Sequence, residues 1–191
     1  MVLLLAALCF AFFGMTSSCL AESENESSEE NLVYDSGIRA GLFSTQPLGV
    51  YAETVRFTPP SSPWTLTKVQ IAGWNGYDNK TLPAEKLIYL EIRDEDLNLL
   101  YQFTDSQIPY FTYTRATLAE IQVPPITVDG DFYVCFYDRG ALGVAYNSTE
   151  IDDGRSYIYN RHTGELSPAT GQRKGSEEFG PLNWIIRAVG H

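Results

Sequence analysis

Few residues in this sequence have the chemistry of a catalytic base or a metal ligand. The chain has two histidines, His162 in a glycine-rich segment and His191 at the last position, and no nucleophile pattern surrounds either. A hydrolytic triad needs a histidine base beside its nucleophile, and a zinc site needs Cys and His at close spacing. The sequence therefore predicts neither site. A carboxylate pair for glycoside hydrolysis stays open, because the separation of two acids is set in space.

Two acidic turns offer oxygen ligands for a hard cation such as calcium. One contains Asp94, Glu95 and Asp96, and the other contains Asp152 and Asp153. Calcium prefers several oxygen ligands, but neither turn has the spacing of an EF-hand loop. Aspartate is also favoured in turns for backbone reasons. Calcium binding and a solvated turn are thus the two interpretations, and no other cofactor is expected.

Tyrosines are frequent in the second half of the chain. An aromatic side chain on a concave face can stack on a sugar ring while its hydroxyl group forms hydrogen bonds. The alternative is that the same side chains fill the core and its margins. The candidate sugar-binding residues are Tyr133, Tyr137, Tyr146, Tyr157 and Tyr159.

A central strand must position several of these tyrosines. Residues 132–137 have the sequence Phe-Tyr-Val-Cys-Phe-Tyr and lie between two turns. Because side chains alternate along a strand, Val134 and the two phenylalanines face one side, and Cys135 and the two tyrosines face the other. We expect a strand buried on both faces, in which Cys135 is a small apolar residue and not a nucleophile.

The rest of the chain predicts further short strands and no helix. Residues 87–93 and 97–103 flank an acidic turn and predict a β-hairpin with one face in the core and one face in water. Pro124 and Pro125 are expected to end a strand over 119–123, because proline cannot donate to a sheet ladder. Residues 160–181 predict a long loop. The fold class is therefore all-β, an antiparallel β-sandwich of jelly-roll-like form with about ten strands.

The N-terminus has the features of a targeting segment and a spacer. Residues 2–15 form an unbroken apolar run. The run is about as long as the core of a signal peptide and shorter than the ~20 residues of a membrane span. Small residues then lead to Cys19, which resembles the lipidated cysteine of the prokaryotic lipobox; cleavage near Ala21 without lipidation is the alternative. Residues 22–31 contain five glutamates and nothing apolar. We expect a signal peptide over 1–21, a disordered acidic spacer over 22–31 and a β-sandwich domain over 32–191.

The net charge of the chain and its glycosylation triplets indicate which partners and which location to expect. The net charge of -11 argues against nucleic acid and anionic lipid as partners, because both bind basic patches. Membrane contact is expected only through an N-terminal lipid. Asn-X-Ser/Thr triplets at Asn25, Asn79 and Asn147 fit an exported, glycosylated chain.

Five segments between about residues 32 and 189 resemble a jelly-roll-like accessory module found in secreted and cell-surface proteins of archaea and some bacteria. The resemblance implies a β-sandwich at the cell envelope, and such modules commonly accompany peptidases or other surface domains. The segments are Val55-Arg56-Phe57-Thr58-Pro59-Pro60, Lys68-Val69-Gln70-Ile71-Ala72-Gly73-Trp74, Gly130-Asp131-Phe132-Tyr133-Val134, Gly154-Arg155-Ser156-Tyr157 and Trp184-Ile185-Ile186-Arg187-Ala188.

These observations predict an extracytoplasmic, non-enzymatic module, either secreted or lipid-anchored at the cell surface. Its expected function is binding of a carbohydrate or glycoprotein at the cell envelope. The first alternative is structural contact with envelope proteins, and the second is a carboxylate-based glycoside hydrolase. A concave aromatic strip would favour carbohydrate, an exposed apolar patch would favour protein contact, and two convergent buried acids would favour the enzyme.

Overall fold

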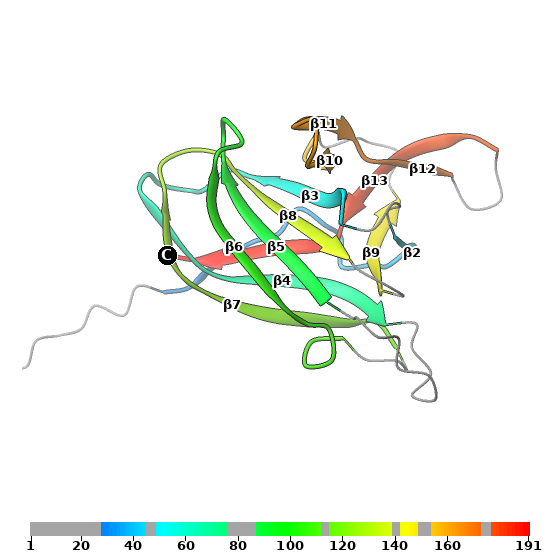
Figure 1. Cartoon of the computed structure of the whole chain (residues 1–191), viewed down its shortest axis with the longest axis horizontal. Coiled ribbons are helices and arrows are strands. Elements are labelled where there is room, and N and C mark those ends of the chain that lie inside the picture. Colours follow the sequence, from blue (N-terminus) through cyan, green and yellow to red (C-terminus); the bar gives the residue numbers. More distant parts are fainter. Residues whose placement is uncertain are drawn as a thin grey trace, which may run out of the picture.

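The fold consists of two antiparallel β-sheets packed together, as the computed structural model of the chain shows (Figure 1). The structure describes residues 28–44, 49–75, 87–111, 115–138, 142–148, 154–172 and 177–191. These residues form fourteen strands. None of them lies in a helix, so they contain no helix that could cross a membrane. The prediction of an all-β antiparallel sandwich is confirmed, with more strands than expected.

The larger sheet has eight strands and is built around its longest member, β4 (Trp64–Asn75). One side of β4 pairs with β7, and the other side pairs with β14 and, further along, with β9. The first strand, β1, lies against β14 with Glu30 opposite Gly190. Among the described residues, regular structure therefore begins at Glu30, within the segment expected to be a spacer. The other strands of this sheet are β1 (Glu30–Leu32), β2 (Gly41–Phe43), β7 (Thr117–Val128), β9 (Leu142–Ser148), β12 (Thr170–Gln172), β13 (Phe179–Trp184) and β14 (Ile186–Gly190).

The smaller sheet has six strands, and β8 lies near its middle, between β3 and β5. Phe132, Val134 and Phe136 of β8 point into the core, while Cys135 and Tyr137 point to the outer face and are also fully buried. The prediction of a strand buried on both faces is confirmed. In sheet order the strands are β11 (Glu165–Pro168), β10 (Ser156–Asn160), β3 (Tyr51–Phe57), β8 (Phe132–Asp138), β5 (Leu87–Asp94) and β6 (Leu99–Ser106).

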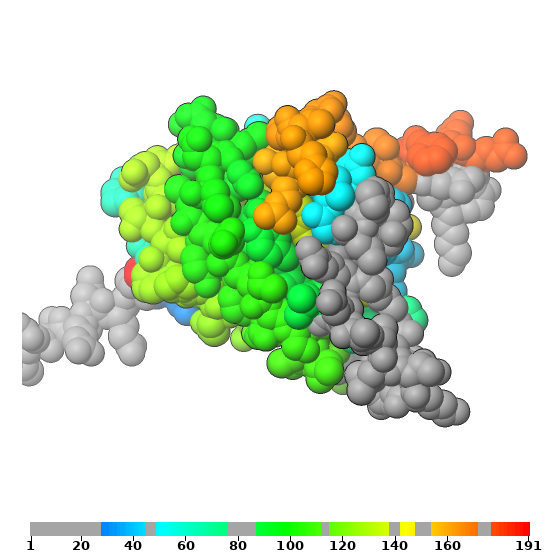
Figure 2. All heavy atoms as spheres, in the orientation of Figure 1, coloured from blue at the N-terminus to red at the C-terminus, as the bar shows by residue number. Residues whose placement is uncertain are grey.

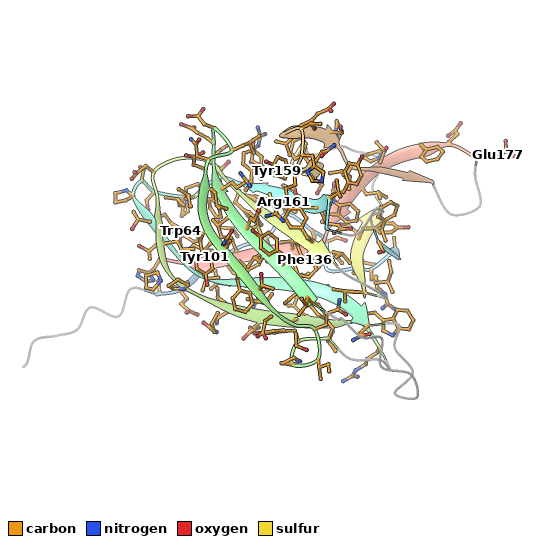
Figure 3. All side chains as sticks on the ribbon, viewed as in Figure 1. Trp64, Tyr101, Phe136, Tyr159, Arg161 and Glu177 are labelled. Carbon is orange, nitrogen blue, oxygen red and sulfur yellow. The ribbon has the colours of Figure 1, made fainter. Side chains whose placement is uncertain are left out.

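Large aromatic side chains fill the space between the sheets. Phe132 stacks on Phe57 with ring centroids 5.4 Å apart and on Trp64 at 5.8 Å. Trp64 and Phe136 lie between the two layers (Figure 3). Burying each such side chain contributes roughly 1.5–3 kcal/mol, so this aromatic core holds the layers together.

The expectation that Pro124 and Pro125 end a strand is wrong, because β7 runs through both prolines to Val128. The pairing register with β4 shifts here: Leu66 lies opposite Ile126, but Lys68 lies opposite Gln122. Among the described strands β7 pairs only with β4 and is an edge strand. A bulge on an edge strand tolerates prolines, because no partner there requires their missing N–H groups.

Two further expectations about strands are corrected. The segment 160–181, expected to be a loop, contains β11, β12 and the start of β13. Its strands are short and rich in polar residues and glycine, so they lack the apolar alternation by which a strand is recognised. The hairpin of β5 and β6 is confirmed, but its outer face is wet only in part, since Gln102 and Thr104 of β6 are exposed while Tyr89 and Arg93 of β5 are half-buried. Glu91 on that face of β5 is 1% exposed.

Candidate functional site

The five candidate tyrosines do not form one exposed strip. Tyr133, Tyr137 and Tyr159 are buried together on the outer face of the six-stranded sheet, with Tyr157 half-buried beside them. Tyr146 belongs to the other sheet, where its ring packs edge-on against Trp184. The structure thus brings four of the five together, and the three buried rings have little surface left for a ligand.

A buried carboxylate explains why this outer face is covered. Glu91 Oε2 accepts hydrogen bonds from Arg93 Nε at 2.8 Å and from the Tyr137 hydroxyl at 2.9 Å. Glu91 Oε1 lies 3.7 Å from Arg161 Nε, and Arg161 Nη2 donates to the Tyr89 hydroxyl at 3.2 Å. We call these five residues the Glu91 cluster. Because its two arginines compensate the buried charge, the cluster forms a satisfied network and not an open site.

Cation–π contacts place the arginines of this cluster over aromatic rings. The Arg161 guanidinium lies 4.6 Å from the centroid of Tyr89, and that of Arg93 lies 5.0 Å from the centroid of Tyr159. Arg161 and Tyr159 both lie over the outer face of the smaller sheet (Figure 3). Sequence reasoning missed this cluster, since a glutamate between apolar residues on a strand is normally taken for a solvated position.

Burial raises the pKa values of groups on this face. Desolvation raises the pKa of the Cys135 thiol to about 12, which keeps it protonated and unreactive. Burial also raises the pKa of Tyr137 well above its ordinary value, with further contributions from Cys135 and Glu91. Cys135 is fully buried as expected, and nothing in its surroundings activates it as a nucleophile.

The two buried glutamates of the described residues, Glu53 and Glu91, do not converge. Glu53 of β3 lies opposite Phe136 of β8 and therefore faces the core, whereas Glu91 of β5 lies opposite Cys135 and faces outward. Because neighbouring strands present paired residues on the same face, the sheet itself separates these two carboxylates. This pair therefore lacks the arrangement of a glycosidase, whose two acids flank one bond from a shared cleft.

The first calcium candidate forms a hydrogen-bonded turn. Asp94 Oδ1 accepts hydrogen bonds from the backbone N–H groups of Asn98 at 2.8 Å and Asp96 at 3.0 Å, and Oδ2 accepts from the Asn98 side chain. The Asn98 side chain is the main cause of the lowered pKa of Asp94. Within the described ranges no group of three or more His, Cys, Asp or Glu residues could hold a metal ion. Glu95 belongs to this turn, and Asp152 and Asp153 lie outside the described residues.

The candidate modification sites fall mostly outside the described residues. Cys19, Asn25 and Asn79 are among those outside. Asn147 lies in β9, opposite Asn183, and is 4% exposed. A side chain so enclosed has no room for a glycan, so the folded domain does not present Asn147 for glycosylation.

An open concave surface of the described chain lies on the outer face of the eight-stranded sheet. Two adjoining hollows of about 490 and 540 Å³ share Arg39, Arg115 and Ala116. Of the described residues that line them, three are arginines and none is acidic. We call this surface the arginine groove; its lining is Gly37, Arg39, Ala40, Gly41, Leu42, Ala72, Trp74, Arg115, Ala116, Thr117, Leu118, Ala145, Ile185 and Arg187.

Residues that are far apart in the sequence contact one another in the wall of this groove. The segment before β2 is held to β9 by a hydrogen bond from Ala40 N to Tyr146 O at 2.8 Å. Gly41 sits so close to the Tyr146 ring that a Cβ atom would lie 2.6 Å from its Cζ. Glycine at this position therefore allows β2 to pack tightly beside the groove.

The residues of the groove carry no local signature in the sequence. Arg39, Arg115 and Arg187 come from three distant segments, and only the sheet topology brings them together. Trp74 lies near the end of β4, but nothing in the sequence indicates that its side chain is half-exposed on a concave face. No protein-family model matches the sequence, and no curated protein is detectably similar to it.

Proposed function

We propose that this protein is an extracytoplasmic, non-enzymatic binding module that holds a carbohydrate in the arginine groove. The observation that carries the proposal is the combination of Trp74 with Arg39 and Arg115 around one open hollow. The N-terminal apolar segment and acidic tract of the sequence support the extracytoplasmic location and the expected position at the cell envelope.

The lining has the chemistry that sugars require. A sugar ring has apolar faces and a rim of hydroxyl groups, so it stacks on an aromatic ring and accepts hydrogen bonds from guanidinium groups. Trp74 supplies the ring, and the arginines supply the donors. Each hollow lies within the ~300–1,000 Å³ typical of ligand sites. The openness of this surface supports the groove over the buried tyrosines as the place for a ligand.

A glycan-array screen of the full-length protein, with and without calcium, tests this proposal. We expect reproducible binding that is lost in Trp74→Ala and retained in Tyr157→Ala, since Tyr157 lies on the other sheet. Circular dichroism of both variants would verify folding. Absence of binding across neutral and acidic glycans would overturn the proposal, and loss in Tyr157→Ala alone would move the site to the tyrosines.

Protein contact is the second candidate, and an exposed aromatic residue favours it. The hairpin of β12 and β13 projects from the body of the domain, and Glu177 lies at its far end (Figures 2 and 3). Phe179 at the start of β13 is 72% exposed. An exposed phenylalanine on a projecting hairpin suits insertion into a partner. Cross-linking on intact cells should capture a partner through the wild-type protein but not Phe179→Ser, with Ile108→Ser as the control for an exposed apolar residue elsewhere.

A further inference from the structure

The arginine groove has a charge opposite to that of the chain around it. The protein carries a net charge of -11, with 24 acidic residues against 13 basic ones. The described lining of the groove reverses this balance, since it contains Arg39, Arg115 and Arg187 and no carboxylate. A concave surface of one sign concentrates ligands of the other sign. The electrostatic character of the groove thus indicates an anionic ligand.

The three arginines have different roles. The Arg187 guanidinium is held by Asp35, with Nε 2.9 Å from Oδ2 and Nη2 2.8 Å from Oδ1. This pair compensates its own charge and fixes the wall. Arg39 is exposed and has no salt bridge with any residue that the structure describes. Arg115 lies just before β7, on the opposite side of the groove, and is also exposed. Arg39 and Arg115 are therefore the two exposed arginines of the groove.

The floor between these arginines is apolar and favours a ring over a bare anion. It is formed by small or aliphatic side chains of β4, β9 and the adjoining segments, with Trp74 at one end; the residues are Ala72, Leu118, Ala145 and Ile185. Phosphate sites typically combine backbone N–H groups of a glycine-rich loop or a helix N-terminus, and no described residue of this chain is helical. A guanidinium group forms two parallel hydrogen bonds with a carboxylate or with a phosphate, so the lack of a helix N-terminus among the described residues is what favours the carboxylate here.

We infer that the arginine groove selects glycans that carry carboxylate groups, such as chains of uronic acid residues. This inference rests on the proposed carbohydrate binding and names the class of sugar. One ring stacks on Trp74, and its carboxylate and that of a neighbouring unit pair with Arg39 and Arg115. Because both arginines are exposed, the interaction weakens as salt screens the charges.

Two tetrasaccharides that differ in whether their carboxyl groups are charged or methyl-esterified test the selection. Calorimetric titration of the full-length protein uses tetragalacturonate and the same tetrasaccharide with every carboxyl group methyl-esterified. We expect the acid to bind at least about tenfold more tightly than the ester, because the ester carries no negative charge that could pair with the guanidinium groups. Raising the salt concentration should weaken binding of the acid and leave the ester unchanged.

Matched variants locate the selecting groups. Arg39→Gln and Arg115→Gln should each weaken binding of the acid by about tenfold without changing binding of the ester. Arg56→Gln is the control, because it removes an arginine of β3 that pairs with Asp131 and lies outside the groove. Thermal melting of the wild-type protein and the three variants verifies that each is folded.

The outcomes separate this inference from the proposed function. Equal binding of acid and ester, or acid binding that survives both arginine substitutions, overturns the selection for carboxylates and leaves carbohydrate binding standing. Binding of neutral glycans on the array together with no binding of tetragalacturonate also overturns it. If no glycan of either kind binds, the proposed function and the inference fall together.

Discussion

Asp35 and Arg187 form a two-point salt bridge across 152 residues of sequence. The Asp35 side chain has no exposed surface, and its Oδ1 also accepts a hydrogen bond from the backbone N–H of Gly37 at 2.7 Å. The positive φ of Gly37, 70°, lets the chain turn here towards β2. One carboxylate thus ties the segment before β2 to β14 and fixes a wall of the arginine groove.

The substitution Asp35→Asn tests this bracing role. The change should lower the free energy of unfolding by roughly 2 kcal/mol, because the Arg187 guanidinium loses its charged partner in a mostly buried position. Chemical denaturation measures the effect. Glu165→Gln, an exposed acid on β11, should leave stability unchanged, and wild-type stability in the Asp35→Asn variant would contradict the assigned role.

Replacement of Glu91 by Ala tests the cluster on the other sheet. It should lower the free energy of unfolding by about 3 kcal/mol, since it leaves Arg93 without its carboxylate and Tyr137 without its acceptor. The control is Glu95→Gln, an exposed acid on the turn after β5, which should change stability by less than about 0.5 kcal/mol. Similar urea midpoints for the two variants would show that the Glu91 cluster is not a stabilising network.

Stability should fall at alkaline pH. Burial raises the pKa of Tyr137 and raises that of Cys135 to about 12, so the folded protein keeps protons that the unfolded chain loses above about pH 9–10. The stabilisation from both groups is therefore complete below about pH 9 and is lost as pH rises. Thermal melts between pH 8 and pH 11.5 should show this decline, and Tyr137→Phe should make it shallower. Melting temperatures that stay constant to pH 11.5 would refute the prediction.

The Cys135 thiol should resist labelling in the native protein. Because it is fully buried and protonated, iodoacetamide at pH 8 should leave it unmodified until the protein unfolds. Mass spectrometry of the peptide that contains Cys135 measures the modified fraction before and after addition of guanidinium chloride. Rapid labelling without denaturant would show that the six-stranded sheet opens readily at β8.

The sequence predicted the strands that have strong apolar alternation. The alternation of Phe132, Val134 and Phe136 matches the inner face of β8, and the segment around Ile88, Leu90 and Ile92 matches β5. The prediction failed where tertiary pairing overrides local chemistry. Prolines end a strand only if a neighbour requires their N–H groups, and a bulge on an edge strand removes that requirement in β7.

The candidate sites could not be predicted from sequence, because each is assembled by topology. Glu91 has the sequence context of a solvated residue. Its burial is explained by its ion pairs with Arg93 and with Arg161, which follows β10. Arg39 and Arg115 lie 76 positions apart in the numbering and meet only because β2 and β7 border the same face of one sheet. The tyrosines are evident in the sequence, but how deeply each is buried depends on the side chains of β3, β5 and β10 that pack beside those of β8 on the outer face of the sheet.

The most direct test of ligand binding in the arginine groove is the tryptophan fluorescence of the full-length protein during titration with tetragalacturonate. Trp64 and Trp184 are buried, so Trp74 is the described tryptophan that a ligand in the groove can touch. The wild-type emission should change saturably, and Trp74→Phe should abolish the change. A saturable change of the same size and midpoint in Trp74→Phe would place the ligand elsewhere and contradict the assignment of the groove.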